Sequence, residues 1–335
     1  MLLPLLTTAL PFIAGGASAF HGSLAGLVAI ASPLLVDLAA SVRGGTRWKA
    51  EAPPPPVPAR YYAVLFHVYA VGFLFFFARF VLTSDALPLV DLLGRSFSWV
   101  VLSGVPTLIV GHALIHQRSR TARALGQALF SLLNYPDFPR LHVEGHHRHV
   151  ATEADHHSAA KGQTFYRFFA RSLAGEVVSM PRAGQRARGV VLLVLQLLLL
   201  AVVAAAAGPR ALLVFVATTF LSRGVVALVN YVQHYGLART PGQKVGVEHA
   251  WDLPYKSGNW LYFNAGFHAD HHMKASTDPA ALTFRSTTFI LPHNIPIILP
   301  LALLPTLFFR TMNPILEAAD QNRAPRRTRS TPARA

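Results

Sequence analysis

Nine histidines stand in four short clusters that fall beside long apolar stretches of the sequence. Imidazole is the commonest metal-binding side chain near neutral pH, although a single histidine indicates little. Nine of them at ligand-like spacings on one chain predict a metal site. The clusters read HALIH, HVEGHH, NYVQHYGL and HADHH, and their histidines are His112, His116, His142, His146, His147, His234, His268, His271 and His272.

The spacing within the clusters suits helices that carry metal ligands on one face. Residues at i and i+4 share a face of an α-helix, so His112 and His116 are expected to bind one ion. His142 and His146 form the same kind of pair, and His147 points to a different side, where it can serve a neighbouring ion. HADHH repeats this arrangement of two ligands on one face and an offset neighbour.

The number of histidines predicts two ions. One zinc ion takes four ligands, so nine neutral nitrogens suit two ions with four or five each. Nitrogen-rich ligation is typical of Fe, Cu, Zn or Ni. A site beside apolar helices favours iron, because that position suggests oxygen chemistry on hydrocarbon. The other seven histidines are expected to be ordinary polar residues.

Some polar residues near the clusters could orient the imidazole rings by hydrogen bonds. Asp270 lies inside HADHH and Glu144 inside HVEGHH, while Asn230 precedes His234 by one helical turn. These three are the candidates for such outer contacts with the ligands. Asp155 and Asp137 are weaker candidates.

The composition indicates an integral membrane protein. The chain has 335 residues, of which 52% are hydrophobic and 13% charged, against roughly 25% charged in a soluble domain. Cysteine is absent, which excludes disulfides, zinc–thiolate, haem–thiolate and iron–sulfur sites on this chain. Electrons for any redox reaction would therefore come from a separate protein.

The net charge of +15 is interpreted as a membrane feature and not as a nucleic-acid-binding one. Lys and Arg accumulate in cytoplasmic loops by the positive-inside rule. Such a surface would also attract anionic membrane lipid or an acidic redox protein.

The apolar stretches predict an all-α membrane fold with six transmembrane helices and a cytoplasmic histidine-rich region. Both termini and all four clusters then lie on the cytoplasmic side. The stretch 289–309 contains four prolines and is expected to be re-entrant or interfacial. We expect one domain over residues 1–316 and a basic, disordered tail over 317–335. The expected spans are two within 2–36, then 61–83, 87–111, 189–207 and 211–232.

The clusters, taken in order, resemble those of the alkane 1-monooxygenase family within the membrane fatty acid desaturase/hydroxylase superfamily. HALIHQ, LHVEGHHRHVAT and FHADHH resemble its three histidine boxes, which desaturases share. NYVQHYGL matches its Asn-Tyr-x-x-His-Tyr-Gly-Leu motif and is the more specific signal. LPTLFFRTMNP is similar to the segment that precedes the C-terminus in that family. The resemblance spans residues 33–314.

The resemblance implies a fatty acid desaturase-like fold and a non-haem centre of two Fe ions held by the nine histidines, with neither haem nor flavin. It implies O2 as co-substrate and hydroxylation of the terminal C–H of alkanes, which would enter from the bilayer. Electrons would come from rubredoxin or a ferredoxin-type donor with an NAD(P)H reductase, at a bacterial inner membrane. Ala113, Gln117 and Gln233 depart from the family pattern, which usually has Glu, Lys and Glu there.

Two other functions use the same residues. The first is a fatty acyl lipid desaturase or fatty acid hydroxylase, against which NYVQHYGL argues. The second is a non-catalytic metal transporter, whose histidines should line a path through the membrane. The clusters are expected beyond one end of the helices, which disfavours transport.

Overall fold

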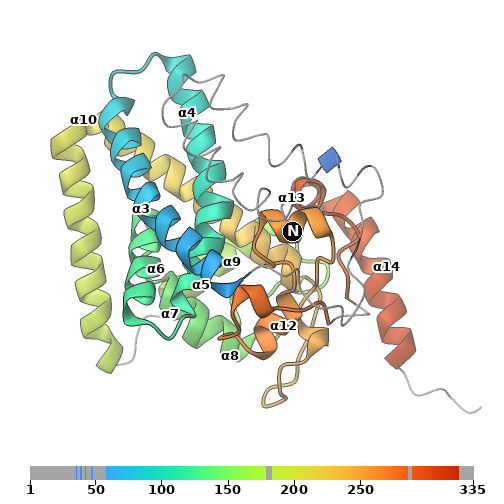
Figure 1. Ribbon diagram of the computed structural model, residues 1–335. Helices are drawn as coiled ribbons and strands as arrows, with labels where there is room; N and C mark the ends of the chain where they lie inside the picture. The colour runs from blue at the N-terminus through green and yellow to red at the C-terminus, as the bar shows by residue number, and fades with distance from the viewer. Residues whose placement is uncertain are drawn as a thin grey trace, which may run out of the picture.

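The computed structural model describes residues 58–178, 183–285 and 289–323, together with Leu35, Leu38, Ala39, Val42 and Arg47. These residues form helices joined by loops, as expected for an all-α protein (Figure 1). The long helices are α3 (Ala59–Ser84), α4 (Leu89–Leu102), α5 (Leu108–Ile115), α6 (Arg120–Leu132), α9 (Phe165–Val178), α10 (Ala183–His234), α13 (Ile295–Ala302) and α14 (Pro305–Arg323). The short ones are α7 (Phe138–Arg140), α8 (His147–His149), α11 (Lys256–Leu261) and α12 (His268–Met273), the 3₁₀-helices η3 (Val247–His249) and η4 (Pro279–Ala281), and the π-helices η1 (Ser103–Thr107) and η2 (Leu141–His146).

Three helical stretches among the described residues are long and apolar enough to cross a membrane, namely Arg60–Ser84, Leu89–Ile115 and Arg186–His234. In the third stretch only 11% of the most apolar window is buried. Its valine and leucine side chains therefore face outward, where water would solvate them poorly and lipid would solvate them well. The chain is an integral membrane protein, as its composition predicts.

Helix α10 is broken at Gly208. The φ of this residue is 82°, a left-handed conformation that favours glycine, and Pro209 follows it. The two parts of α10 leave the break in different directions (Figure 1). Arg210 donates hydrogen bonds of 2.8 and 3.0 Å to the carbonyl oxygens of Asp85 and Leu87. The break in α10 and the turn between α3 and α4 therefore lie at the same end of the molecule.

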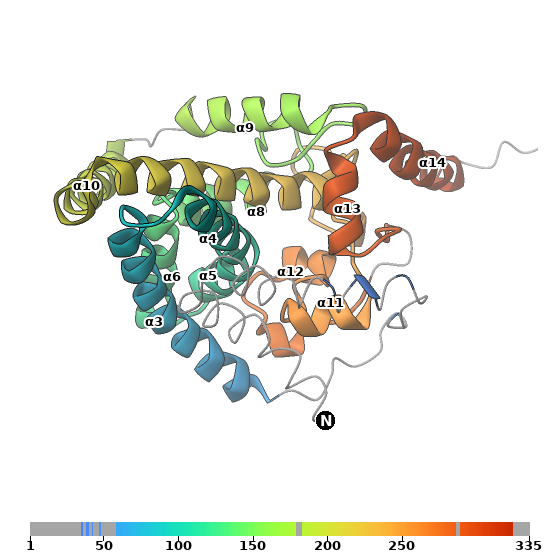
Figure 2. The same ribbon diagram turned by 90° about the horizontal axis from the view of Figure 1, so that it is seen from above.

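The other end of these helices carries the histidine-rich residues 112–178 and 235–285, which we call the cap. Figure 2 shows α9 beside α10, on the side opposite α3, α4 and α6. Four of the six expected spans, from 61 to 232, fall on helices. The two expected within 2–36 lie outside the described residues.

Aromatic side chains hold α3 in place. Phe73 and Phe80 stack on Trp99 of α4, with ring centroids 4.9 and 4.7 Å apart. Phe66 packs edge-on against Phe263 of the cap at 5.1 Å. Buried aromatic pairs of this kind combine a large apolar area with a defined geometry. They fix α3 to a neighbouring span and to the cap at once.

The proline-rich stretch after residue 289 forms two helices, α13 and α14, that meet at an angle of 117°. Such a bend fits either a broken span or a re-entrant loop, so the expected re-entrant or interfacial element stays a prediction. Helix α14 then continues to Arg323, so residues 317–323 are helical and the expected boundary of the tail at 317 is wrong. Leu316 and Ala319 are buried, and this packing extends the helix. Residues 324–335 of the expected tail lie outside the described residues.

Helix α6 supports the histidine-bearing helix α5 through a close contact at Gly126. A Cβ at this position would lie 2.7 Å from Ile115 Cγ2 and 2.9 Å from the carbonyl oxygen of Gly111. We expect Gly126→Ala to lower the free energy of unfolding by about 1–3 kcal/mol, as overpacking usually does. A thermal unfolding series of the purified protein measures this. Gly224→Ala is the matched control, because no atom lies within 4 Å of a Cβ on this helical glycine, and an unchanged or raised midpoint is expected there.

Candidate metal centre

The structure brings all nine predicted histidines together in two neighbouring groups. Within each group the candidate ligand nitrogens lie within 4.8 Å of one another. The groups also touch, since the rings of His147 and His272 have centroids 4.5 Å apart. The five-histidine group contains His112, His116, His142, His147 and His271, and the four-histidine group contains His146, His234, His268 and His272.

The nitrogens converge as ligands do around an ion. In the five-histidine group, Nε2 of His147 lies 2.9 Å from Nε2 of His142 and 3.1 Å from Nε2 of His271. In the other group, Nε2 of His268 lies 3.0 Å from Nε2 of both His234 and His272. Two nitrogens bound at right angles to a zinc-like ion, each at about 2.1 Å, are about 3.0 Å apart. The spacing therefore fits a metal coordination shell.

Hydrogen bonding alone does not satisfy these rings. A neutral imidazole has one donor and one acceptor nitrogen. Nε2 of His112, His116 and His146 is buried without a hydrogen-bond partner among the described residues. A buried polar atom without a partner costs about 1–3 kcal/mol. A bound cation would take up these lone pairs, so the residues fit a metal ion in each group.

Helix geometry divides the HVEGHH cluster differently from the sequence prediction. Residues 141–146 form the π-helix η2, in which hydrogen bonds join residues i and i+5. His142 and His147 consequently share one group, and His146 belongs to the other. The predicted pairing of His142 with His146 on one ion, which assumed an α-helix, is wrong. That this cluster serves two ions stays a prediction, and its histidines are divided between the two groups.

The HADHH cluster lies on the α-helix α12 and divides as its spacing predicts. His268 and His272, at i and i+4, belong to the four-histidine group. His271 is offset and belongs to the five-histidine group together with the α5 pair, His112 and His116. Two of the four clusters thus contribute to both groups.

Two outer contacts fix which nitrogen faces the centre. Nδ1 of His234 lies 3.2 Å from the carbonyl oxygen of His249. A carbonyl oxygen can only accept a hydrogen bond, so Nδ1 carries the hydrogen and donates it. The other nitrogen, Nε2, is then free of hydrogen and is the candidate metal ligand. Nδ1 of His146 lies 2.8 Å from Oδ2 of Asp155. A carboxylate in this position orients the ring and makes it a better ligand.

Asp155 is itself held by a buried network. Its Oδ1 accepts from the backbone N–H of His157 at 2.9 Å, and its Oδ2 accepts from the hydroxyl of Ser158 at 2.6 Å. Burial would raise the pKa of the Asp155 carboxyl, but charge on His146 and the hydrogen bonds from His146 and Ser158 outweigh burial and lower the pKa below its usual value. The group is therefore an anion beside a candidate ligand.

Burial disfavours the charged form of several of these imidazoles, and the neutral form is the one that binds metal. Burial, followed by the neighbouring His146, lowers the pKa of His116 to about 4. The same causes, burial first and neighbouring histidines second, lower the pKa values of His142, His147, His268, His271 and His272 well below the ordinary value.

The other candidates for outer contacts lie elsewhere. The carboxylate of Asp270 accepts from Arg285 Nε at 2.7 Å and from the backbone N–H of Thr283 at 2.9 Å, so it ties α12 to the following loop. Glu144 is exposed on η2. Nδ2 of Asn230 lies 3.4 Å from Nδ1 of His157, a histidine outside the nine. Asp155, the weaker candidate, is the carboxylate that reaches a ligand, and only its position shortly after HVEGHH pointed to it.

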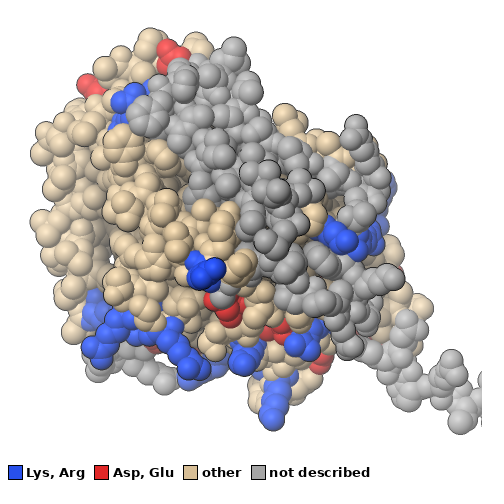
Figure 3. Space-filling view, viewed as in Figure 1, with Lys and Arg blue, Asp and Glu red and all other residues tan. Residues whose placement is uncertain are grey.

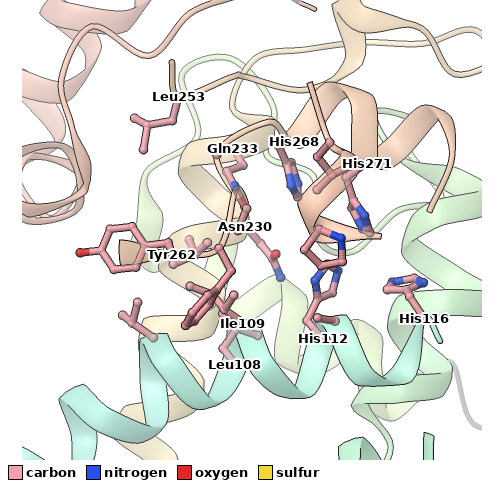
Figure 4. Close-up of a pocket in the computed structure, with 18 of the residues that line it drawn as sticks. Leu108, Ile109, His112, His116, Asn230, Gln233, Leu253, Tyr262, His268 and His271 are labelled. Carbon is pink, nitrogen blue, oxygen red and sulfur yellow. The ribbon is translucent and has the colours of Figure 1, made fainter. Parts of the chain in front are cut away.

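An apolar pocket ends at the histidines (Figure 4). His112, His268 and His271 lie at one end of it, and Leu253 and Tyr262 lie toward the other. Its walls come from η1 and α5, from α10, from the loops around α11 and α12, and from α13. A small apolar molecule in this pocket would approach the metal centre with little water around it.

We expect Asp155→Asn to weaken metal binding by about 10–100-fold, because the variant removes the anion that orients His146. Titration of the metal-free protein with Fe²⁺ or Zn²⁺ measures this affinity. Glu153→Gln is the control, since Glu153 is exposed nearby. Equal affinity in Asp155→Asn and in the unaltered protein would show that the contact contributes nothing to binding.

One histidine from each group tests the two-ion arrangement. We expect His146→Ala and His271→Ala each to lose at least one bound ion, because each removes a ligand from a different group. Metal analysis of the purified variants gives the count per chain. His67→Ala should keep the full metal content, since His67 is exposed on α3 and contacts the carbonyl oxygen of Ala63. Full metal content in either site variant would exclude that histidine as a ligand.

Comparison with known proteins gives a family and several relatives. The fatty acid desaturase family model matches residues 92–283, which include all nine histidines. Alkane 1-monooxygenase 1 of Pseudomonas aeruginosa is 30% identical over 68% of this chain and 64% of its own length. Alkane 1-monooxygenase 2 of Alcanivorax borkumensis is 26% identical over 74% of this chain and 71% of its own length.

A third relative, the xylene/toluene monooxygenase hydroxylase component XylM of Pseudomonas putida, is 31% identical over 54% of this chain and 52% of its own length. The chain thus spans less than two thirds of the length of two of these three relatives. The family model covers more than half of the chain and includes the whole metal centre. This chain therefore belongs to the fatty acid desaturase family.

Proposed function

We propose that the protein is a membrane monooxygenase with a non-haem di-iron centre that hydroxylates the terminal C–H of alkanes or similar aliphatic chains to alcohols. The observation that carries this proposal is the meeting of two histidine groups with the end of an apolar pocket. The names of the relatives, which are alkane and xylene/toluene monooxygenases, support the same reaction class.

The donor set supports iron in pairs. Five and four imidazoles are enough for two ions, and imidazole nitrogens suit Fe as well as Zn, Cu and Ni. Among these metals we propose iron, because the relatives are named as monooxygenases and activation of O2 requires a redox-active metal. Two iron ions held there would supply the activation of O2 and the removal of hydrogen from the substrate carbon. We propose O2 as the oxidant on this basis.

The chain's own residues position the substrate. His112, His116, His142, His268 and His271 form part of the pocket wall, so a carbon at that end lies against the metal centre. Leu108, Ile109 and Val229 line the adjoining wall and exclude water from the reacting carbon. An extended apolar chain with one end at the histidines would present its terminal carbon, which supports terminal hydroxylation.

The charge distribution supports a cytoplasmic cap. Lys and Arg gather along the edge of the molecule that carries the cap (Figure 3). By the positive-inside rule this edge faces the cytoplasm, in a bacterial inner membrane. A basic surface also suits an acidic electron donor, and we propose rubredoxin or a ferredoxin-type protein with its NAD(P)H reductase.

The function is tested by supplying isotopically labelled O2 and a panel from hexane to octadecane, together with the matching fatty acids, to membranes that contain the protein and an electron donor. We expect primary alcohols that carry one labelled oxygen atom, identified by mass spectrometry. Membranes that contain His271→Ala are the control and should form none. An unlabelled product with a new C=C bond would replace the proposal by desaturation.

A further inference from the structure

Hydroxylation needs protons as well as electrons. In R–H + O2 + 2 electrons + 2 protons → R–OH + H2O, one oxygen atom leaves as water whose O–H bonds take up the protons. The walls of the pocket beside the histidines are mainly apolar. A bare charge does not cross such surroundings without polar partners. A polar route should therefore connect solvent to the pocket.

A buried polar cluster lies between α9 and α10, beside the metal centre and distinct from it. Glu176 of α9 accepts from Arg223 Nη2 of α10 at 2.6 Å. The hydroxyl of Tyr135, from the loop after α6, donates to the other carboxylate oxygen of Glu176. Ser172 contacts the same oxygen from within α9. These groups, with His157 from the loop after α8, are the polar neighbours that face Glu176.

The inner side of the cluster leads to the pocket. Nε2 of His157 lies 4.0 Å from Oε1 of Glu176, a distance that a water molecule can bridge. Nδ1 of His157 lies 3.4 Å from Nδ2 of Asn230. Asn230 also lines the reaction pocket, where Figure 4 shows it between Gln233 and His112. The sequence of contacts therefore runs from Glu176 to the pocket that ends at the metal centre.

A small cavity follows the same route. It is lined by Glu176, Arg223, Tyr135, His157 and Asn230 among others. Its free volume of about 10 Å³ is close to the roughly 10–15 Å³ that one water molecule requires. Asn230 belongs to the walls of both this cavity and the reaction pocket. One side chain thus separates a water-sized polar space from the apolar space where the substrate binds.

The outer side of the cluster reaches the surface of the molecule, where Glu176 belongs to the cap and Arg223 to the span in α10. The side chain of Glu176 is 10% exposed and that of Arg223 is 25% exposed. Burial raises the pKa of the Glu176 carboxyl, and the hydrogen bonds from Tyr135, Arg223 and Ser172 oppose this rise. A carboxyl group with a raised pKa holds a proton at higher pH than an ordinary glutamate does. Exposure at one edge allows that proton to be replaced from solvent.

We propose that Glu176 delivers protons to the reaction pocket by way of water in the small cavity, which His157 and Asn230 hold in place. The proposal rests on the proposed monooxygenase function. The O–H bond of the Glu176 carboxyl breaks, water in the cavity carries the proton to the oxygen atom that leaves as water, and solvent restores the carboxyl. The amide Nδ2 of Asn230 is a donor, so this side chain orients the water and carries no proton itself. The external donor supplies the electrons. Glu176 touches neither substrate nor metal and acts through its neighbours.

Glu176→Gln tests the proposal in the full-length, iron-loaded protein in lipid vesicles, with octane, O2 and the electron donor that supports the unaltered protein. We expect kcat to fall at least about tenfold, since proton transfer by a positioned side chain contributes about 10²–10⁴-fold. KM and iron content should stay unchanged, and the solvent isotope effect in deuterated water should rise. Glu176→Asp, which keeps the carboxyl, should recover part of the rate. An unaltered kcat and isotope effect in Glu176→Gln would overturn the proposal, as would loss of iron in parallel with rate.

Tyr135→Phe gives a second test that leaves the Glu176–Arg223 ion pair in place. The Tyr135 hydrogen bond lowers the pKa of Glu176, so its loss should raise that pKa. Because Glu176 delivers a proton only when protonated, the fall in rate with rising pH should move to higher pH. An unmoved pH profile would count against the proposal.

Glu317→Gln is the matched control, because it removes an exposed ion pair with Lys161 at 3.0 Å and should change nothing. The experiment distinguishes failure of the monooxygenase proposal from failure of the proposed role of Glu176. An unaltered protein that forms no oxygenated product contradicts the monooxygenase function, whereas an active protein with an equally active Glu176→Gln variant contradicts only the role of Glu176.

Discussion

Nine imidazoles can be buried together only if something takes up the lone pairs of their converging nitrogens. Burial lowers the pKa values of His116, His142 and His271 and so disfavours their charged forms. Several nitrogens of the histidine groups find no partner among the described residues. Each such atom costs about 1–3 kcal/mol, so the arrangement is costly without a cation and favourable with one. A metal bound by these histidines would couple its own binding to the folding of the cap, because the energy of binding is also energy of folding.

The membrane helices make this convergence possible. Two ligand positions follow directly from apolar helices, His116 at the end of α5 and His234 at the end of α10. Ser103 of η1, the segment that leads into α5, forms a 2.6 Å hydrogen bond with Ser222 of α10. Gly126 of α6 packs closely against α5 on another side. The lipid-facing surface and the two histidine groups thus depend on the same helices.

The spans and the set of histidines that meet could be predicted from the sequence, because composition and residue spacing depend on them directly. The long runs without charge predict the spans, Gly208-Pro209 predicts the break in α10, and the clusters predict which histidines meet. Contacts between distant segments leave no such pattern. Asp155 reaches His146 only because the loop after α8 folds back, and Asp270, although it lies inside a cluster, is held by Arg285 instead. The sequence also does not predict where α14 ends. The basic residues after 316 are typical of a disordered tail, but packing of this segment extends the helix to Arg323.

The HVEGHH cluster shows how a local change of helix type decides which histidines lie in the same group. In an α-helix His142 and His146 would share a face and bind one ion, leaving His147 apart. The π-helix brings residues i and i+5 onto one face, so His142 joins His147 and releases His146 to the other group. His146 is also the ring that Asp155 orients. The same short turn therefore supplies adjacent histidines to the two groups, which ties the spacing of the groups to neighbouring residues of the chain.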